Sequence, residues 1–83
     1  METETGKVVH YFDKIGVAVI KLNRDLKIGD KIRIESKTGD FIQSVISMEV
    51  KHEFIENAKA DDEVGMKVDE KVKEGDIVYL LSE

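Results

Sequence analysis

The sequence predicts an all-β fold, a small antiparallel β-barrel of six to seven strands. Short runs rich in β-branched and aromatic residues alternate with glycine-bearing turns at intervals of about eight to twelve residues, a spacing typical of small sandwiches and barrels. The 83 residues contain no proline that would interrupt a strand and no cysteine that would cross-link the chain. A chain of this length forms one domain, and closure into a barrel protects the edges of its apolar strands.

The first strands are expected at residues 7–12 and 15–22, after a polar start. Residues 1–5 carry no apolar run and are expected to form a flexible N-terminus, which leaves residues 6–83 as the single barrel domain. The run IGVAVIKL is apolar at both alternating sets of positions. It therefore predicts a central strand that is covered on both faces.

The middle of the chain contains a regular strand followed by an irregular one. In KIRIE, Ile32 and Ile34 alternate with charged residues and are expected to face the core. A turn is expected next, at residues 38–40. The longer run FIQSVISMEVK, residues 41–51, has apolar residues at both alternating sets of positions. We therefore expect a β-bulge near Ser44 that re-aims part of this strand.

The segment EFIENAKA, residues 53–60, fits either a short helix or an extended conformation. Eight residues are marginal for a helix, and the flanking strands could as easily hold the segment extended. Two further strands are expected at residues 63–68 and 76–81. The predicted core consists of apolar residues on these strands: Val17, Val19, Ile32, Ile34, Val64, Met66 and Ile77.

Two stretches repeat one local pattern ahead of a strand. LKIGDKIRI and VKEGDIVYLL both place an apolar residue, a lysine, a variable residue, a glycine and an aspartate before the strand. Glycine supplies a turn position with a positive φ, and aspartate hydrogen-bonds nearby backbone. Each Gly-Asp pair therefore predicts a turn.

The net charge of −5 is unevenly distributed along the chain. Residues 1–51 hold nine lysines and arginines against eight acidic residues, whereas residues 52–83 hold four against ten. Attraction to phosphate is the main source of sequence-independent nucleic-acid affinity, so any RNA contact is expected in the first half. The candidate cations there are Lys14, Lys21, Arg24, Lys27, Lys31, Arg33 and Lys37, with Tyr11 or Phe12 as a stacking platform for a base.

Catalytic signatures are missing from the sequence. There is no Gly-x-x-x-x-Gly-Lys-Ser/Thr loop for a nucleotide, no Gly-x-Ser-x-Gly and no His-Glu-x-x-His. His10, mid-strand and expected to be partly buried, and His52 have no third ligand at metal spacing. Residues 61–63 are acidic, but consecutive strand side chains point apart. We therefore expect a protein that is not an enzyme and that uses no metal or cofactor.

Location is inferred from the same composition. The start METETGK cannot be a signal peptide, and no stretch has the roughly 20 apolar residues of a membrane span. We expect a cytoplasmic protein with no membrane contact. The high content of charged residues, 37%, is typical of thermophilic proteins.

Three elements, LKIGDKIRI, VISMEVKHEFIENAKADDEVGMKV and VKEGDIVYLL, resemble a known domain in their order and spacing. The domain is the second, β-barrel domain of translational GTPases of the elongation factor Tu and elongation factor 1-alpha type. The same domain type is the C-terminal barrel of collagenase-like peptidases and also occurs as free-standing small proteins. The chain departs from the family pattern at Asp61, where the family usually has a glycine.

The resemblance implies a binding role on the barrel surface. In elongation factor Tu-like proteins a pocket on this barrel receives the aminoacylated 3′ end of tRNA, and by resemblance Glu49 and His52 fall at that pocket. The leading interpretation is a non-catalytic, translation elongation factor-like binding module that contacts RNA or a ribonucleoprotein. The alternative is a protein-interaction subunit that acts with a collagenase-like peptidase-type enzyme. A third hypothesis is a barrel subunit of an RNA particle, because GKVVH and IGDKI are similar to the barrel subunit of the box H/ACA particle. This similarity ends after Ile34.

Overall fold

Ten short strands make up the regular structure of the computed structural model, which describes residues 2–37 and 39–81. In chain order they are β1 (Glu2–Phe12), β2 (Val17–Leu22), β3 (Leu26–Lys27), β4 (Lys31–Glu35), β5 (Phe41–Ser44), β6 (Met48–Val50), β7 (Glu53–Phe54), β8 (Asn57–Ala58), β9 (Glu63–Lys67) and β10 (Ile77–Leu81). No helix occurs among the described residues, so none there could span a membrane. The predicted all-β class is confirmed.

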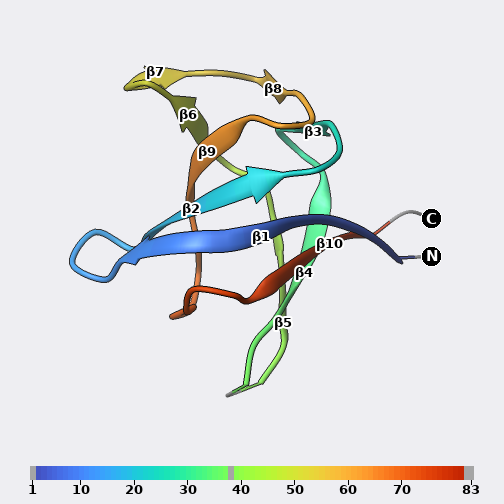
Figure 1. Cartoon of the computed structure of the whole chain (residues 1–83), viewed down its shortest axis with the longest axis vertical. Helices are drawn as coiled ribbons and strands as arrows, with labels where there is room; N and C mark the ends of the chain where they lie inside the picture. The colour runs from blue at the N-terminus through green and yellow to red at the C-terminus, as the bar shows by residue number, and fades with distance from the viewer. Residues whose placement is uncertain (1, 38, 82–83) are drawn as a thin grey trace.

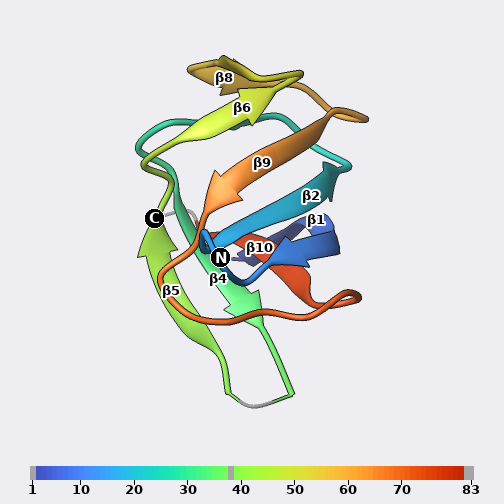
Figure 2. The same ribbon diagram turned by 90° about the vertical axis from the view of Figure 1, so that its left-hand side faces the viewer.

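Eight of the strands form one curled antiparallel sheet in the order β5-β4-β10-β1-β2-β9-β6-β7. Figure 2 shows β6, β9 and β2 stacked one above another, with the rest of the sheet curling round beneath them. Strands β3 and β8 form a separate two-stranded ribbon near the β6 end of the sheet (Figure 1). The result is a half-barrel whose edge strands β5 and β7 do not pair with each other.

The core lies inside the curl and is built from residues of alternating strand positions. Ile32, Ile34, Val64 and Met66 are fully buried, as predicted. Val17, Val19 and Ile77 are only partly buried, and the core instead contains their neighbours Ala18, Ile20 and Val78. The physical reason is that β2 and β10 are apolar at both sets of positions, so alternation alone could not tell which set faces inward.

The long run at residues 41–51 is broken rather than bulged. Strand β5 ends at Ser44 and β6 begins at Met48, and the two strands lie far apart in the sheet order. Between them Val45 is buried, and its backbone exchanges hydrogen bonds with Gly29 and Asp30 at 2.9 and 2.8 Å. The apolar residues at both alternating sets of positions in residues 41–51 therefore indicate two separate strands rather than one bulged strand.

A buried glutamine ties edge strand β5 to the end of β9 and to the segment that follows it. The Gln43 side chain donates from Nε2 to the Lys67 carbonyl at 3.0 Å and accepts the Asp69 N–H on Oε1 at 2.8 Å. It is 5% exposed, whereas the flanking Ile42 is 57% exposed. Since β5 and β9 are not neighbours in the sheet, this amide spans the open side of the half-barrel.

The N-terminal residues differ from the expected flexible terminus. Glu2 to Thr5 belong to β1, where Glu2 pairs with Leu81 and Thr3 with Leu80 of β10 (Figure 1). Thr5 is fully buried, and its hydroxyl donates to the Thr3 carbonyl at 2.9 Å. Polar composition suggested disorder, but the pairing with β10 satisfies the backbone of these residues.

The two predicted Gly-Asp turns are confirmed and share one geometry. Gly29 and Gly75 have φ values of 94° and 95°. In the first turn the Asp30 carboxylate accepts the Lys27 N–H at 3.0 Å, and in the second the Asp76 carboxylate accepts the N–H three residues earlier at 2.9 Å. Each aspartate N–H also donates back to the lysine carbonyl, at 3.1 Å in both turns.

A third turn repeats this geometry at residues 59–62, with Asp61 in place of the glycine. Asp61 has a φ of 76°, the Asp62 carboxylate accepts the Lys59 N–H at 3.0 Å, and the Asp62 N–H donates to the Lys59 carbonyl at 3.0 Å. The preceding residues 53–60, for which a helix was weighed, are extended and contain β7 and β8. The departure from the family pattern therefore preserves the turn.

Candidate functional site

One hollow of the described surface lies on the outer face of the sheet, where the β1–β2 turn faces β2, β9 and β6. Its volume is about 680 Å³. Val17, Val19 and Gly65 line it on β2 and β9, and Phe12 and Ile15 line it beside the turn. Phe12 is 46% exposed and Ile15 is 58% exposed. Both faces of β2 are apolar because one face packs in the core and the other lines this hollow.

Glu49 projects across the apolar part of this hollow. It pairs with Gly65 of β9, which pairs in turn with Val19 of β2, so the three residues form one row across the sheet. A Cβ on Gly65 would lie 3.3 Å from Glu49 Cγ and 3.6 Å from Glu49 Oε1. The half-buried Glu49 side chain therefore lies over Gly65. It fits there because residue 65 has no side chain.

His52 reaches the same hollow from the tip of the β6–β7 hairpin. Lys51 and His52 form the two-residue loop between the paired Val50 and Glu53, and their φ values are 51° and 67°. Two positive φ values are the signature of a type I′ turn, whose twist matches that of a β-hairpin. The pair indicated by resemblance, Glu49 and His52, is thus brought together by the fold.

A second hollow of about 250 Å³ continues the first on the other side of Glu49. The two hollows share Val17, Glu49 and Gly65, and the second also includes Phe54, which is 80% exposed. We call these two hollows together the Glu49 groove. A carboxylate therefore lies in the middle of a groove whose surface is mainly apolar.

One rim of the groove is acidic. Asp61, Asp62 and Glu63 line the larger hollow together with Glu49, and the cations there are Lys51 and, when protonated, His52. The nearby Lys21 uses its ammonium to donate to the Asp61 carbonyl at 2.7 Å. The local potential is therefore negative, which attracts cations and opposes phosphates.

The basic candidates are dispersed over the molecule. Lys14 lies in the β1–β2 turn, whereas Lys21 and Arg24 lie at the opposite end of β2. Lys27 is in the β3–β8 ribbon, and Lys37 follows β4. Strand β4, which carries Lys31 and Arg33, is separated from β2 by β10 and β1. The fold does not gather these cations beside the Glu49 groove.

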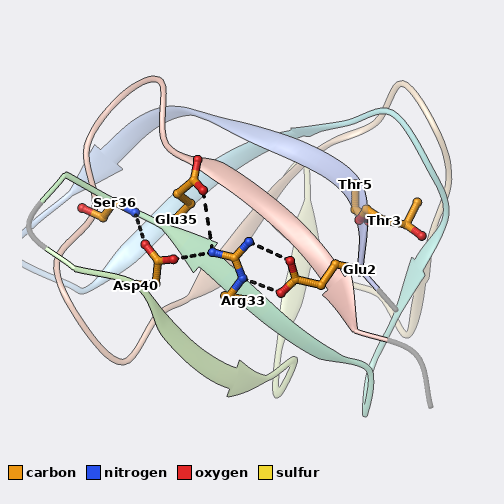
Figure 3. Close-up of polar contacts among 7 residues, drawn as sticks. All are labelled: Glu2, Thr3, Thr5, Arg33, Glu35, Ser36 and Asp40. Carbon is orange, nitrogen blue, oxygen red and sulfur yellow. Dashed lines mark hydrogen bonds and ion pairs between the residues drawn. The ribbon is translucent and has the colours of Figure 1, made fainter.

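Arg33 is held by acidic neighbours, as Figure 3 shows. Its guanidinium donates to both Glu2 carboxylate oxygens, at 2.8 Å for Nη2 to Oε1, and also to Asp40. It lies 3.8 Å from Glu35 Oε2 and packs over the Tyr79 ring, 4.5 Å from its centroid. The hydrogen bond from Arg33 lowers the pKa of Glu2, and the bond with Glu2 raises the pKa of Arg33. Arg33 would have to give up these contacts to bind a phosphate.

Both histidines are exposed. His10 was expected to be partly buried, but its side chain is 51% exposed and its Nδ1 lies 3.5 Å from Glu74 Oε1. The register shift between Val8 and His10 in the β1–β2 pairing turns it outward. Among residues 2–37 and 39–81, no three histidine, aspartate or glutamate side chains converge closely enough to hold a metal ion.

Comparison with known proteins finds similarity to proteins named as a protease or a peptidase. No protein-family model matches it. It is 47% identical, over 81 residues and 96% of its length, to a protein of Methanocaldococcus jannaschii named an uncharacterized protease. The chain spans about a fifth of that relative, 20% of its length.

Two solved structures show the same fold, both of the C-terminal domain of a U32 peptidase from Geobacillus thermoleovorans. One has a TM-score of 0.89 at 16% identity and covers 95% of this chain and 92% of that one. The other, its selenomethionine variant, has a TM-score of 0.87 at 16% identity and covers 92% and 96%. The chain shares the fold of this C-terminal peptidase domain. Of the two main interpretations of the sequence, the comparisons favour the peptidase-associated alternative over the translation-factor one.

Proposed function

We propose that the chain is a non-catalytic protein-interaction domain that acts with the body of a peptidase-type enzyme. The observation that carries the proposal is the 47% identity to one fifth of a protein named a protease, over 96% of this chain. The solved domains of similar fold likewise come from a U32 peptidase. A domain that recurs as a minor part of larger proteins works most directly by contacting the rest of such a protein or what that protein acts on.

The test uses the Methanocaldococcus jannaschii protein from which the stretch matching this chain has been deleted. Titration of this chain into that truncated protein in a calorimeter should give saturable binding with a Kd in the micromolar range or tighter, about −8 kcal/mol. Restored proteolysis of casein in the mixture, with no peptide release by the chain alone, would add direct support. Absence of heat at tens of micromolar of both proteins would overturn the proposal.

A second candidate function is contact with the 3′ end of an aminoacylated RNA. It is favoured by one observation, that Glu49 and His52 line the same hollow. The acidic rim at Asp61, Asp62 and Glu63 opposes it, because these carboxylates repel the phosphates that supply most RNA affinity. We therefore place it second.

A further inference from the structure

The apolar surface of the Glu49 groove is unusual for a chain with 37% charged residues. Phe12, Ile15 and Phe54 are 46%, 58% and 80% exposed, and all three line its hollows. The partly buried Val17 and Val19 form the floor between them. Contiguous exposed apolar residues framed by charges are typical of surfaces that bind other molecules.

The position of Glu49 restricts what can cover this surface. A carboxylate that loses water without gaining a donor is strongly destabilised. Glu49 lies over Gly65 in the middle of the groove, and no hydrogen bond or ion pair to its side chain is found within the described residues. Any partner that buries the apolar floor must therefore bring a hydrogen-bond donor to Glu49.

The rim selects a cationic donor. Asp61, Asp62 and Glu63 add negative charge to the larger hollow, and with Glu49 they outnumber the permanent cations of the groove, Lys51 and Lys67. Lysine and arginine suit such a surface, because their aliphatic stems pack on apolar side chains while the charged group reaches a carboxylate. Arginine also forms paired hydrogen bonds with a carboxylate.

We propose that the Glu49 groove binds an extended cationic polypeptide segment, with a lysine or arginine at Glu49 and apolar side chains in the hollows on either side. This inference rests on the proposed function, since it identifies the chemistry of the segment that a peptidase-type partner would present. The alternating pattern follows from the arrangement of two apolar hollows about one central carboxylate. Alternate side chains of an extended peptide point to the same face, which allows several of them to enter the groove together.

The first experiment uses a defined peptide pair and the isotope-labelled chain. One peptide is acetylated, amidated and built of alternating leucine and glycine around a central arginine, and the matched peptide has glutamine at the centre. The arginine peptide should shift the amide NMR signals of Val19, Val50 and Gly65. It should bind about tenfold more tightly than the glutamine peptide, the difference expected for a charge-assisted pair.

The variant Glu49→Gln keeps the shape of the side chain and removes its charge, so the preference for arginine should fall to about twofold or less. The matched control is Glu70→Gln, a change of an exposed glutamate outside both hollows that should leave the preference intact. Both variants should unfold at the wild-type urea midpoint. Equal binding of the two peptides, no binding of either, or an unchanged preference in Glu49→Gln would overturn the inference. Stronger shifts of the same amides by a single-stranded oligoribonucleotide ending in CCA would assign the groove to RNA instead.

The truncated Methanocaldococcus jannaschii protein separates this inference from the proposed function. If that protein binds wild type and Glu49→Gln equally, the proposed function holds and the groove is not its docking site. If the arginine peptide binds through Glu49 but the truncated protein does not bind, the groove chemistry holds and the peptidase-type partner is wrong. Loss of binding to the truncated protein in Glu49→Gln but not in Glu70→Gln supports both.

Discussion

Three turns of this fold each depend on one residue with a positive φ, and in one of them this residue is Asp61 instead of glycine. Asp61 has a φ of 76° where the two equivalent turns have glycine at 94° and 95°. Aspartate tolerates this region better than most residues, but it still carries strain that glycine lacks. The substitution is permitted because the bonds that define the turn come from its neighbours Lys59 and Asp62.

The change Asp61→Gly is therefore expected to stabilise the protein slightly, by about 0 to 1 kcal/mol, because relief of strain exceeds the added freedom of the unfolded chain. Urea denaturation followed by circular dichroism measures the difference. Gly75→Ala is the matched control: nothing lies within 4 Å of the added Cβ, so its expected loss of about 1 kcal/mol reports the backbone alone. A marked destabilisation by Asp61→Gly would show that the Asp61 carboxylate is structurally engaged.

Glu2 and Arg33 make the start of β1 sensitive to acid. The pKa of Glu2 is lowered in the folded state, chiefly by the hydrogen bond from Arg33, below its ordinary value of 4.5. A carboxyl group with a lowered folded pKa stabilises the fold above its unfolded pKa and loses this contribution as the pH falls through the folded value. The difference in unfolding free energy between wild type and Glu2→Gln should therefore be present at neutral pH and vanish on acidification. Raising the salt concentration should reduce it.

At the candidate site, resemblance located Glu49 and His52, and the structure brings both to one hollow. Their partners could not be read from spacing, because Val19 and Gly65 reach Glu49 through strand pairing between distant parts of the chain. The same is true of Arg33, which looks like a free surface cation in KIRIE. Only the fold reveals that Glu2 and Asp40 hold it.

At the scale of elements, the alternation of apolar and polar residues predicted the inward face of some strands correctly and that of others wrongly. Strands β4 and β9 carry charged or glycine residues between their apolar ones, so their inward faces were identified correctly. Strand β2 is apolar at both alternating sets of positions from Val17 to Ile20, so its core face had to be decided by strand pairing and by the register shift in β1. The break after β5 was hidden for the same reason, since Ile42 and Ile46 look like core residues but are 57% and 62% exposed.

The two faces of the β4–β5 hairpin should respond very differently to truncation. Ile34→Ala removes a fully buried side chain and should destabilise the protein by about 2 to 5 kcal/mol. Ile42→Ala removes a side chain that is 57% exposed and should have an effect of about 0.5 kcal/mol or less. Chemical denaturation of the two variants gives both values. Equal losses would show that the β5 register is wrong.

Gln43 should stabilise the protein through its two hydrogen bonds across the open side of the half-barrel. Gln43→Leu keeps a buried apolar stem but leaves the Lys67 carbonyl and the Asp69 N–H without this partner, so we expect a loss of about 1 to 3 kcal/mol. Amide hydrogen exchange should also accelerate at Asp69. Ser44→Ala, a change of the exposed neighbouring residue, is the control and should be nearly neutral. An unprotected Asp69 amide in the wild type would contradict this role of Gln43.

For the whole molecule, the all-β class could be predicted from local features of the sequence that do not depend on the order of the strands in the sheet. Regular turn spacing, the Gly-Asp pairs and the absence of proline are local features, and they are sufficient to indicate an all-β domain. The sheet order is a global property, decided by which apolar faces can be buried together. It is also what builds the Glu49 groove, because β2, β9 and β6 are neighbours there although they are distant in sequence.

The pairing of β1 with β10 joins residues from opposite ends of the sequence, Glu2 with Leu81 among them. During synthesis on the ribosome β1 emerges before β10, so one edge of β1 stays uncovered until β10 has also emerged. Loop closure over such a separation is slow, so refolding of the isolated chain is expected to take milliseconds to seconds, as for other small barrels of high contact order. Stopped-flow fluorescence of the tyrosines can measure this rate. Until β10 has emerged, the backbone N–H and C=O groups of Glu2–Lys7 have no partner on that edge, and unpaired strand edges of this kind are where chains associate and aggregate.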